Sequence, residues 1–69
     1  MLIDVRSTQE YQRGHRPGSA NIPLEHVRDI NVPKDTPILL YCKSGGRAEQ
    51  AKSILLAMGY TDVTNLGGF

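Results

Sequence analysis

A chain of 69 residues can form one small domain, and its formal net charge of +1 gives no broad field that would favour nucleic acid or an acidic membrane. The single cysteine, Cys42, excludes an internal disulfide and a cysteine-based zinc site, and two distant histidines make a weak case for any other metal. No apolar run approaches the roughly 20 residues of a transmembrane helix, and no signal-peptide pattern is present. For the residues present, we expect a cytoplasmic domain with no metal and no cofactor.

The first half of the chain contains short elements. Residues 2–5 are apolar except for one acidic residue, Asp4, and this pattern predicts a strand. Ser7 and Glu10 have the spacing of a capping box, which predicts a short helix from about residue 8 to residue 12. After a turn, residues 20–22 predict a very short strand. Residues 24–29 have apolar side chains spaced for one or two helical turns.

The second half contains the stronger patterns. Residues 37–41 form an apolar run typical of a buried strand. Residues 47–58 place apolar side chains at helical spacing, and Gly59 is a natural stop. Residues 61–66 predict a last strand, with Val63 and Leu66 as its apolar anchors. Because strands alternate with helices, the expected fold class is α/β, a small parallel sheet of about four strands with helices on both faces.

Polar residues follow two of these strands at their carboxyl ends, where open parallel sheets form their sites. Asp4 and Arg6 end the first strand and Cys42 ends the third, so they share one edge of the sheet if the two strands are neighbours. We expect Asp4 and Arg6 to support loops through a salt bridge and not to react. His15 follows a glycine in a turn and is expected to fix that turn, while His26 is expected at the surface.

The segment after the central strand has the layout of an anion-binding loop: Cys42, Lys43, Ser44, Gly45, Gly46 and Arg47. Glycines let successive backbone N–H groups converge, and the helix that follows adds a partial positive charge. Arg47 adds a permanent cation. All three effects favour thiolate over thiol, so we expect a lowered pKa at Cys42. A lone cysteine is usually a small buried hydrophobe, but the adjacent Gly-Gly-Arg favours a reactive thiol.

Seven motifs run through the chain in order: Asp4-Val5-Arg6, Glu10-Tyr11, Gly14-His15, Gly18 to Pro23, Tyr41 to Ala48, Gly59-Tyr60 and Gly67-Gly68-Phe69. This series resembles the single-domain rhodaneses, or thiosulfate sulfurtransferases, and is similar to the small phage-shock-type members. The resemblance spans nearly the whole chain and identifies residues 1–69 as one rhodanese-like domain.

The resemblance implies sulfur transfer through a persulfide. Cys42 would take a sulfane sulfur from a donor such as thiosulfate and pass it to a thiophilic acceptor, either cyanide or a thiol. The backbone amides from Lys43 to Arg47 would cradle the outer sulfur, and the side chains of Lys43 and Arg47 would attract the anionic donor. Similar phosphatases and arsenate reductases have a longer loop, whereas only four residues separate Cys42 from Arg47 here, which favours a cradle for one sulfur.

The chain also departs from the family pattern. It lacks the family's first short strand and its last helix, which leads us to expect an exposed sheet edge and self-association through it. Arg16 stands where the family often has isoleucine or valine, and the sequence gives this cation no purpose. A non-catalytic docking or regulatory module is therefore the alternative. The intact loop favours the enzyme, and the short length favours the module.

Overall fold

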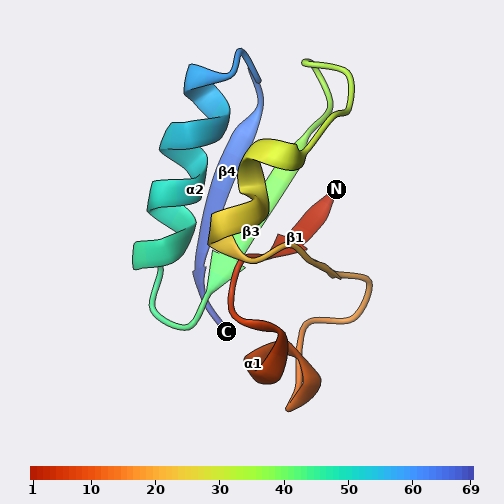
Figure 1. Ribbon diagram of the computed structural model, residues 1–69, viewed down its shortest axis with the longest axis vertical. Coiled ribbons are helices and arrows are strands. Elements are labelled where there is room, and N and C mark those ends of the chain that lie inside the picture. Colours follow the sequence, from red (N-terminus) through yellow and green to blue (C-terminus); the bar gives the residue numbers. More distant parts are fainter.

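The computed structural model describes residues 1–69 and shows an α/β fold built on one parallel sheet (Figure 1). Its elements, in chain order, are β1 (Leu2–Asp4), α1 (Thr8–Gln12), β2 (Ala20–Asn21), the 3-10 helix η1 (Leu24–Asp29), β3 (Ile38–Cys42), α2 (Gly46–Ala57) and β4 (Val63–Gly68). Every predicted element is present, with ends displaced by at most two residues. The capping box of α1 is also present, with both of its reciprocal hydrogen bonds.

The four strands are all parallel and follow the order β2-β1-β3-β4. β1 and β3 are therefore neighbours, and Asp4 is paired with Tyr41 in their register. This pairing places the end of β1 beside the cysteine at the end of β3. The shared edge expected for Asp4, Arg6 and Cys42 is thus present, and it lies at the carboxyl ends of the strands, where parallel sheets form their sites.

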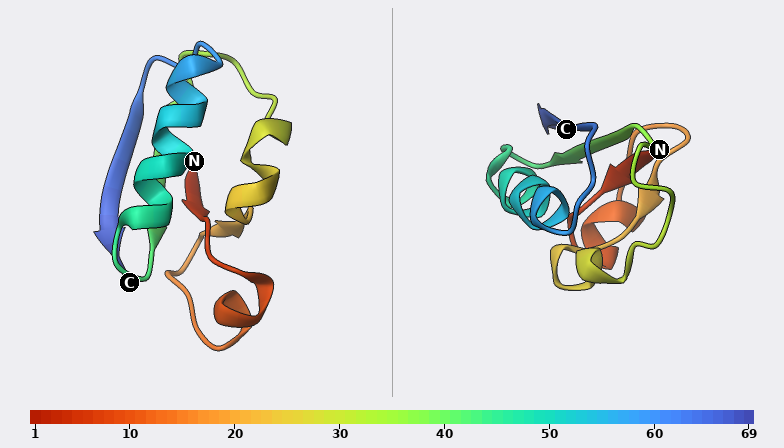
Figure 2. Two further views of the ribbon diagram at one scale, coloured as in Figure 1. Left: turned by 60° about the vertical axis from the view of Figure 1, so that its left-hand side comes forward. Right: turned by 90° about the horizontal axis from the view of Figure 1, so that it is seen from above.

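α2 and η1 pack on the same face of the sheet and bury a common core (Figure 2). That core combines β1 and β3 side chains, such as Ile3 and Leu40, with Val27 of η1 and Leu55 of α2. We expected helices on both faces, but the two longer helices share one face and α1 lies beyond the carboxyl ends of the strands (Figure 1). The longest helix, α2, has 12 residues, and no helix here could cross a bilayer.

The opposite face of the sheet has less cover. Leu39 of β3 and Leu66 of β4 are exposed on it, although Leu66 was expected to anchor the last strand. Near the carboxyl edge, the same face carries Tyr41, which is fully buried but does not belong to the core under α2. Tyr41 and Cys42 are adjacent in β3, so their side chains leave the strand on opposite sides. The two faces therefore carry different chemistry at the same edge.

Candidate active site

Cys42 is the last residue of β3 and lies where the chain turns into α2. Its side chain faces the core under α2, and the residue is 1% exposed. The backbone N–H of Gly45 donates to Sγ over 2.9 Å, and that of Ala48 donates over 3.4 Å. Amides at the start of a helix carry its partial positive charge. The local geometry therefore favours a negatively charged sulfur at this position.

The turn after Cys42 depends on two glycines. Gly45 is the N-cap of α2 and has a φ of 95°, a left-handed conformation that only glycine adopts without steric cost. Gly68 of β4 is paired with Cys42, at a point where the β3–β4 ladder is irregular. A Cβ on Gly68 would lie 2.5 Å from the carbonyl oxygen of Lys43, so a larger residue would displace the loop. The loop is thus supported by β4 as well as by α2.

Two opposing effects act on the thiol of Cys42. Burial raises its pKa, because the thiolate loses more hydration than the thiol. Backbone hydrogen bonds lower it, and they come from Ala48, Ser44, Gly45 and Arg47. The hydrogen bonds together outweigh burial, so the pKa of Cys42 lies below the ordinary value of a cysteine. The thiolate is the nucleophilic form, so this shift favours reactivity.

The guanidinium of Arg47 binds a partner that the sequence did not assign to it. Its Nη1 lies 2.6 Å from Oε1 of Glu10, and its Nη2 lies 3.0 Å from Oε2. The same carboxylate accepts the backbone N–H of Ser7 in the capping box of α1. The hydrogen bond from Arg47 is the largest of the effects that lower the pKa of Glu10 to about 2. This pair joins α1 to the first turn of α2, and it leaves Lys43 as the loop cation without an ion pair.

Asp4 and Arg6 form a buried ion pair beside the loop, with residue exposures of 0% and 6%. Nη2 of Arg6 lies 2.7 Å from Oδ2 of Asp4, and its Nε lies 3.0 Å from both carboxylate oxygens. Burial raises the pKa of Asp4, but the hydrogen bonds from Arg6 outweigh it and the net shift is downward. Nη2 also donates to the carbonyl of Gly14 over 2.7 Å. The pair therefore connects the end of β1 to the turn after α1.

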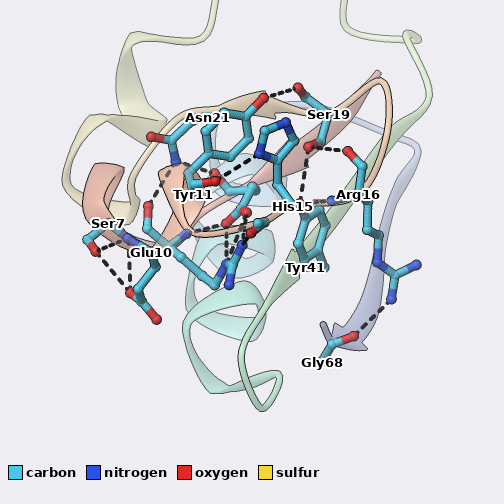
Figure 3. A network of polar contacts seen from close by, with 12 residues as sticks. Ser7, Glu10, Tyr11, His15, Arg16, Ser19, Asn21, Tyr41 and Gly68 are labelled. Atoms are coloured by element: carbon cyan, nitrogen blue, oxygen red, sulfur yellow. Dashed lines mark hydrogen bonds and ion pairs between the residues drawn. The ribbon is translucent and has the colours of Figure 1, made fainter.

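A second polar network surrounds Tyr41 on the face away from Sγ (Figure 3). The hydroxyl of Tyr41 accepts the backbone N–H of Arg16 over 3.0 Å and lies 3.1 Å from Oγ of Ser19. Nη2 of Arg16 donates to the carbonyl of Gly68 over 2.8 Å. The guanidinium carbon is 5.0 Å from the centre of the Tyr41 ring. The sequence assigned no role to Arg16, and the structure fixes its side chain at the carboxyl edge of the sheet.

Both histidines have local partners. The ring of His15 stacks on Tyr11 with the ring centres 3.6 Å apart, and its Nδ1 lies 2.8 Å from the Tyr11 carbonyl oxygen. His26 lies on η1, exposed, 3.6 Å from the carboxylate of Asp29. No group of three His, Cys, Asp or Glu side chains is close enough together to hold a metal ion.

The structure places the backbone amides of Gly45 and Ala48 on Sγ of Cys42, and the Asp4–Arg6 pair on the neighbouring strand. Two contacts were missed from the sequence. Glu10 carried a signal as the second member of a capping box, but nothing in the spacing connects it to Arg47. The approach of Gly68 to Lys43 arises from the pairing of β4 with β3, which local sequence does not encode.

Comparisons with known proteins agree with this geometry. The family model of the rhodanese-like domain matches residues 1–69. The chain is 46% identical to thiosulfate sulfurtransferase PspE of Escherichia coli (strain K12), over 96% of this chain and 67% of that protein. It is 36% identical to a sulfurtransferase of Allochromatium vinosum, over 99% of this chain and 65% of that protein. The chain thus spans about two thirds of the length of these relatives.

Solved structures show the same fold. The chain superimposes on a structure described as a rhodanese with anions from E. coli with a TM-score of 0.90 and 42% identity, covering 97% of this chain and 84% of that one. The human single-domain sulfurtransferase TSTD1 gives a TM-score of 0.90 at 26% identity, covering 97% of this chain and 74% of that one. These similarities support a sulfurtransferase. The family model, the sequence relatives and the fold all lead to one conclusion: the chain belongs to the family of rhodanese-like domains.

Proposed function

We propose that this domain moves a sulfane sulfur from an anionic donor such as thiosulfate to a thiophilic acceptor, cyanide or a thiol, through a persulfide on Cys42. The observation that carries the proposal is the pair of backbone N–H groups, from Gly45 and Ala48, that donate to Sγ at the start of α2. Hydrogen bonds to a charged acceptor contribute about 1.5–3 kcal/mol each, which is enough to favour a thiolate and then a persulfide anion.

The first half of the reaction forms one bond and breaks one bond. The Cys42 thiolate attacks the sulfane sulfur of thiosulfate, the Sγ–S bond forms, and the S–S bond of thiosulfate breaks. Sulfite leaves with the electron pair of that bond, and the negative charge of the thiolate passes to the outer sulfur. A covalent carrier of this kind divides the transfer into two steps.

The loop residues have different parts in this proposal. The amides of Ser44, Gly45 and Arg47 add to that of Ala48 in holding negative charge on the sulfur. Gly46 is the first residue of α2, and a Cβ at this position would meet no atom within 4 Å. Lys43 is exposed and has no ion pair, so its ammonium group is available to the anionic donor. The relative described as a rhodanese with anions supports anion binding by this fold.

Intact-mass measurement tests the proposal directly. After brief incubation with thiosulfate, the wild-type chain should gain the mass of one sulfur, and added cyanide should remove it. The variant Cys42→Ser should gain nothing. If the folded wild-type chain gains no sulfur, the persulfide proposal fails and the docking module becomes the better interpretation.

The pH dependence of alkylation provides a second measurement. Because Cys42 is 1% exposed, a small reagent such as iodoacetamide is the suitable probe. The lowered pKa of Cys42 predicts that the rate reaches its plateau at a lower pH than for a free cysteine in a peptide, whose pKa is about 8.5. A midpoint at or above the peptide value would contradict the thiolate on which the proposed reaction depends.

A further inference from the structure

Arg16 differs from the other two arginines at the carboxyl edge of the sheet. Arg6 and Arg47 are each paired with a carboxylate at 2.7 Å or less. Arg16 forms no ion pair, and its side-chain hydrogen bond goes to the neutral carbonyl of Gly68. A guanidinium has five N–H donors in a planar fork that fits a carboxylate. The charge of Arg16 and most of its donors are therefore available to a ligand.

The side chain of Arg16 is already held in one place. Its backbone N–H donates to the hydroxyl of Tyr41, and its backbone carbonyl accepts both the N–H and the hydroxyl of Ser19. Its guanidinium lies over the Tyr41 ring and is hydrogen-bonded to Gly68 (Figure 3). Ordering a free arginine side chain costs up to about 2 kcal/mol of conformational entropy. Because the Arg16 side chain is already ordered in the free protein, ligand binding does not incur this loss.

The position of Arg16 suits a group at some distance from the sulfur. Gly68, which accepts its hydrogen bond, is the strand partner of Cys42, and neighbouring strands lie about 4.8 Å apart. The guanidinium is thus on the order of 10 Å from the cysteine backbone, on the face opposite the amides that hold Sγ. Thiosulfate is compact and ends within a few bond lengths of the sulfur that attacks it. Cys42 and Gly68 both end their strands, so a longer molecule that passes over the carboxyl edge of the sheet could contact the outer sulfur and Arg16 together.

We infer that Arg16 binds the carboxylate of the thiol that accepts the sulfur, a thiol whose acidic group lies several bonds away from its sulfur atom. This inference rests on the proposed persulfide and assigns Arg16 to the second half of the reaction. The acceptor thiolate attacks the outer sulfur of the Cys42 persulfide and forms a new S–S bond. The bond between Sγ and the outer sulfur breaks, and Cys42 leaves as the thiolate, so no oxidant or reductant is needed.

Three acceptors separate charge from length: 6-mercaptohexanoate is long and acidic, 6-mercaptohexanol is long and neutral, and mercaptoacetate is short and acidic. The chain is first loaded with thiosulfate, and the loss of the extra sulfur is followed by intact mass after each acceptor is added. The wild-type chain should react faster with 6-mercaptohexanoate than with 6-mercaptohexanol. The variant Arg16→Gln should lose on the order of tenfold in the second-order rate constant for the long acid only.

Two further variants serve as controls. Arg28→Gln removes the same charge from an exposed position on η1, where the arginine forms no ion pair, and should keep the preference for the long acid. Arg16→Lys keeps the charge without the planar fork and should recover part of that preference. In Arg16→Gln, the rate of loading with thiosulfate and the alkylation pH profile of Cys42 should both stay as in the wild type. These two readouts would change if Arg16 only supported the loop.

Each other outcome overturns the inference. An equal fall in rate for the long acid and the long alcohol would show that Arg16 does not recognise the carboxylate. A fall in the loading rate would assign Arg16 to the donor or to loop support. A wild-type chain with no preference between the two long acceptors would show that the enzyme has no selectivity for the carboxylate, and so none that Arg16 could provide. Failure of the wild-type chain to gain sulfur appears before any acceptor is added, so it is distinguishable as a failure of the proposed function itself.

Discussion

Tyr41 and Cys42 are adjacent in β3, and they show how one strand end can support two different environments. Around Cys42 the contacts are backbone N–H groups at the start of α2, and the neighbouring side chains are apolar. Around Tyr41 the contacts are polar and charged: its hydroxyl accepts the backbone N–H of Arg16 (Figure 3), and the guanidiniums of Arg6 and Arg16 both lie within 6 Å of its ring centre. Alternation along a strand sends the two side chains to opposite faces, so each environment is built by different parts of the chain.

The two environments are stabilised by different kinds of group. Backbone amides cannot be removed by ordinary substitutions, so the Cys42 side tolerates sequence change provided that the turn keeps its shape. The Tyr41 side depends on paired charges and hydroxyl groups, and a buried charge that loses its partner is costly. We therefore expect the largest loss of stability when a buried charge pair on the Tyr41 side is broken, with little direct effect on the thiolate.

The largest effect should come from Asp4→Asn, which leaves the charge of Arg6 buried without its carboxylate. Breaking a buried pair in this way costs about 3–5 kcal/mol of unfolding free energy. Stability of small domains is about 0.05–0.15 kcal/mol per residue, or about 3–10 kcal/mol for 69 residues, so this loss removes a large part of the total. Urea unfolding followed by circular dichroism measures the loss.

Asp29→Asn is the matched control for this variant, since the Asp29 side chain is 82% exposed. That variant should unfold at nearly the same urea concentration as the wild type, because exposed ion pairs contribute little. An Asp4→Asn chain that loses no more stability than Asp29→Asn would show that the buried pair does not hold this side together.

A smaller and pH-dependent effect is expected for Glu10→Gln on the Cys42 side, where the Glu10–Arg47 pair joins α1 to α2. The loss should be about 1 kcal/mol at neutral pH, because the pair is bidentate but partly exposed. The folded pKa of Glu10 is lowered to about 2 from 4.5. Its contribution is therefore complete above pH 4.5 and is lost as the pH falls toward 2.

The difference in unfolding free energy between the wild type and Glu10→Gln, measured by urea titration at several pH values, checks this dependence. The difference should shrink between pH 4.5 and about 2. A difference that stays constant across this range would mean that the carboxylate charge of Glu10 contributes nothing beyond its place in the capping box.

The smallest effect should come from Tyr41→Phe, which removes the hydroxyl that accepts the backbone N–H of Arg16. We expect a loss of about 0.5 kcal/mol and no change in the alkylation pH profile of Cys42. Tyr60→Phe makes the same chemical change under the helices, where the hydroxyl of Tyr60 donates to the carbonyl of Ile30 over 2.9 Å. It should lose a similar amount. A shifted alkylation profile in Tyr41→Phe would show that the two faces are coupled.

Much of this architecture could be predicted from local sequence. Apolar runs and turn residues indicated all four strands, the capping box indicated α1, and the Cys-x-x-Gly-Gly-Arg segment indicated an amide-rich loop at a helix start. These features depend on residues a few positions apart, whose spacing is fixed by the chain itself. The pairing of Asp4 with Arg6 belongs to the same class, since the two residues are two positions apart.

Only the tertiary structure decided which distant groups meet. Glu10 reaches Arg47 because α1 lies beyond the carboxyl ends of the strands, and Arg16 reaches Gly68 because β4 is paired with β3. The placement of α2 and η1 on the same face was also decided at this level, by the apolar core that the two helices bury together. Local sequence sets backbone conformation and spacing, whereas contacts between distant residues follow from the way the whole chain buries its apolar surface.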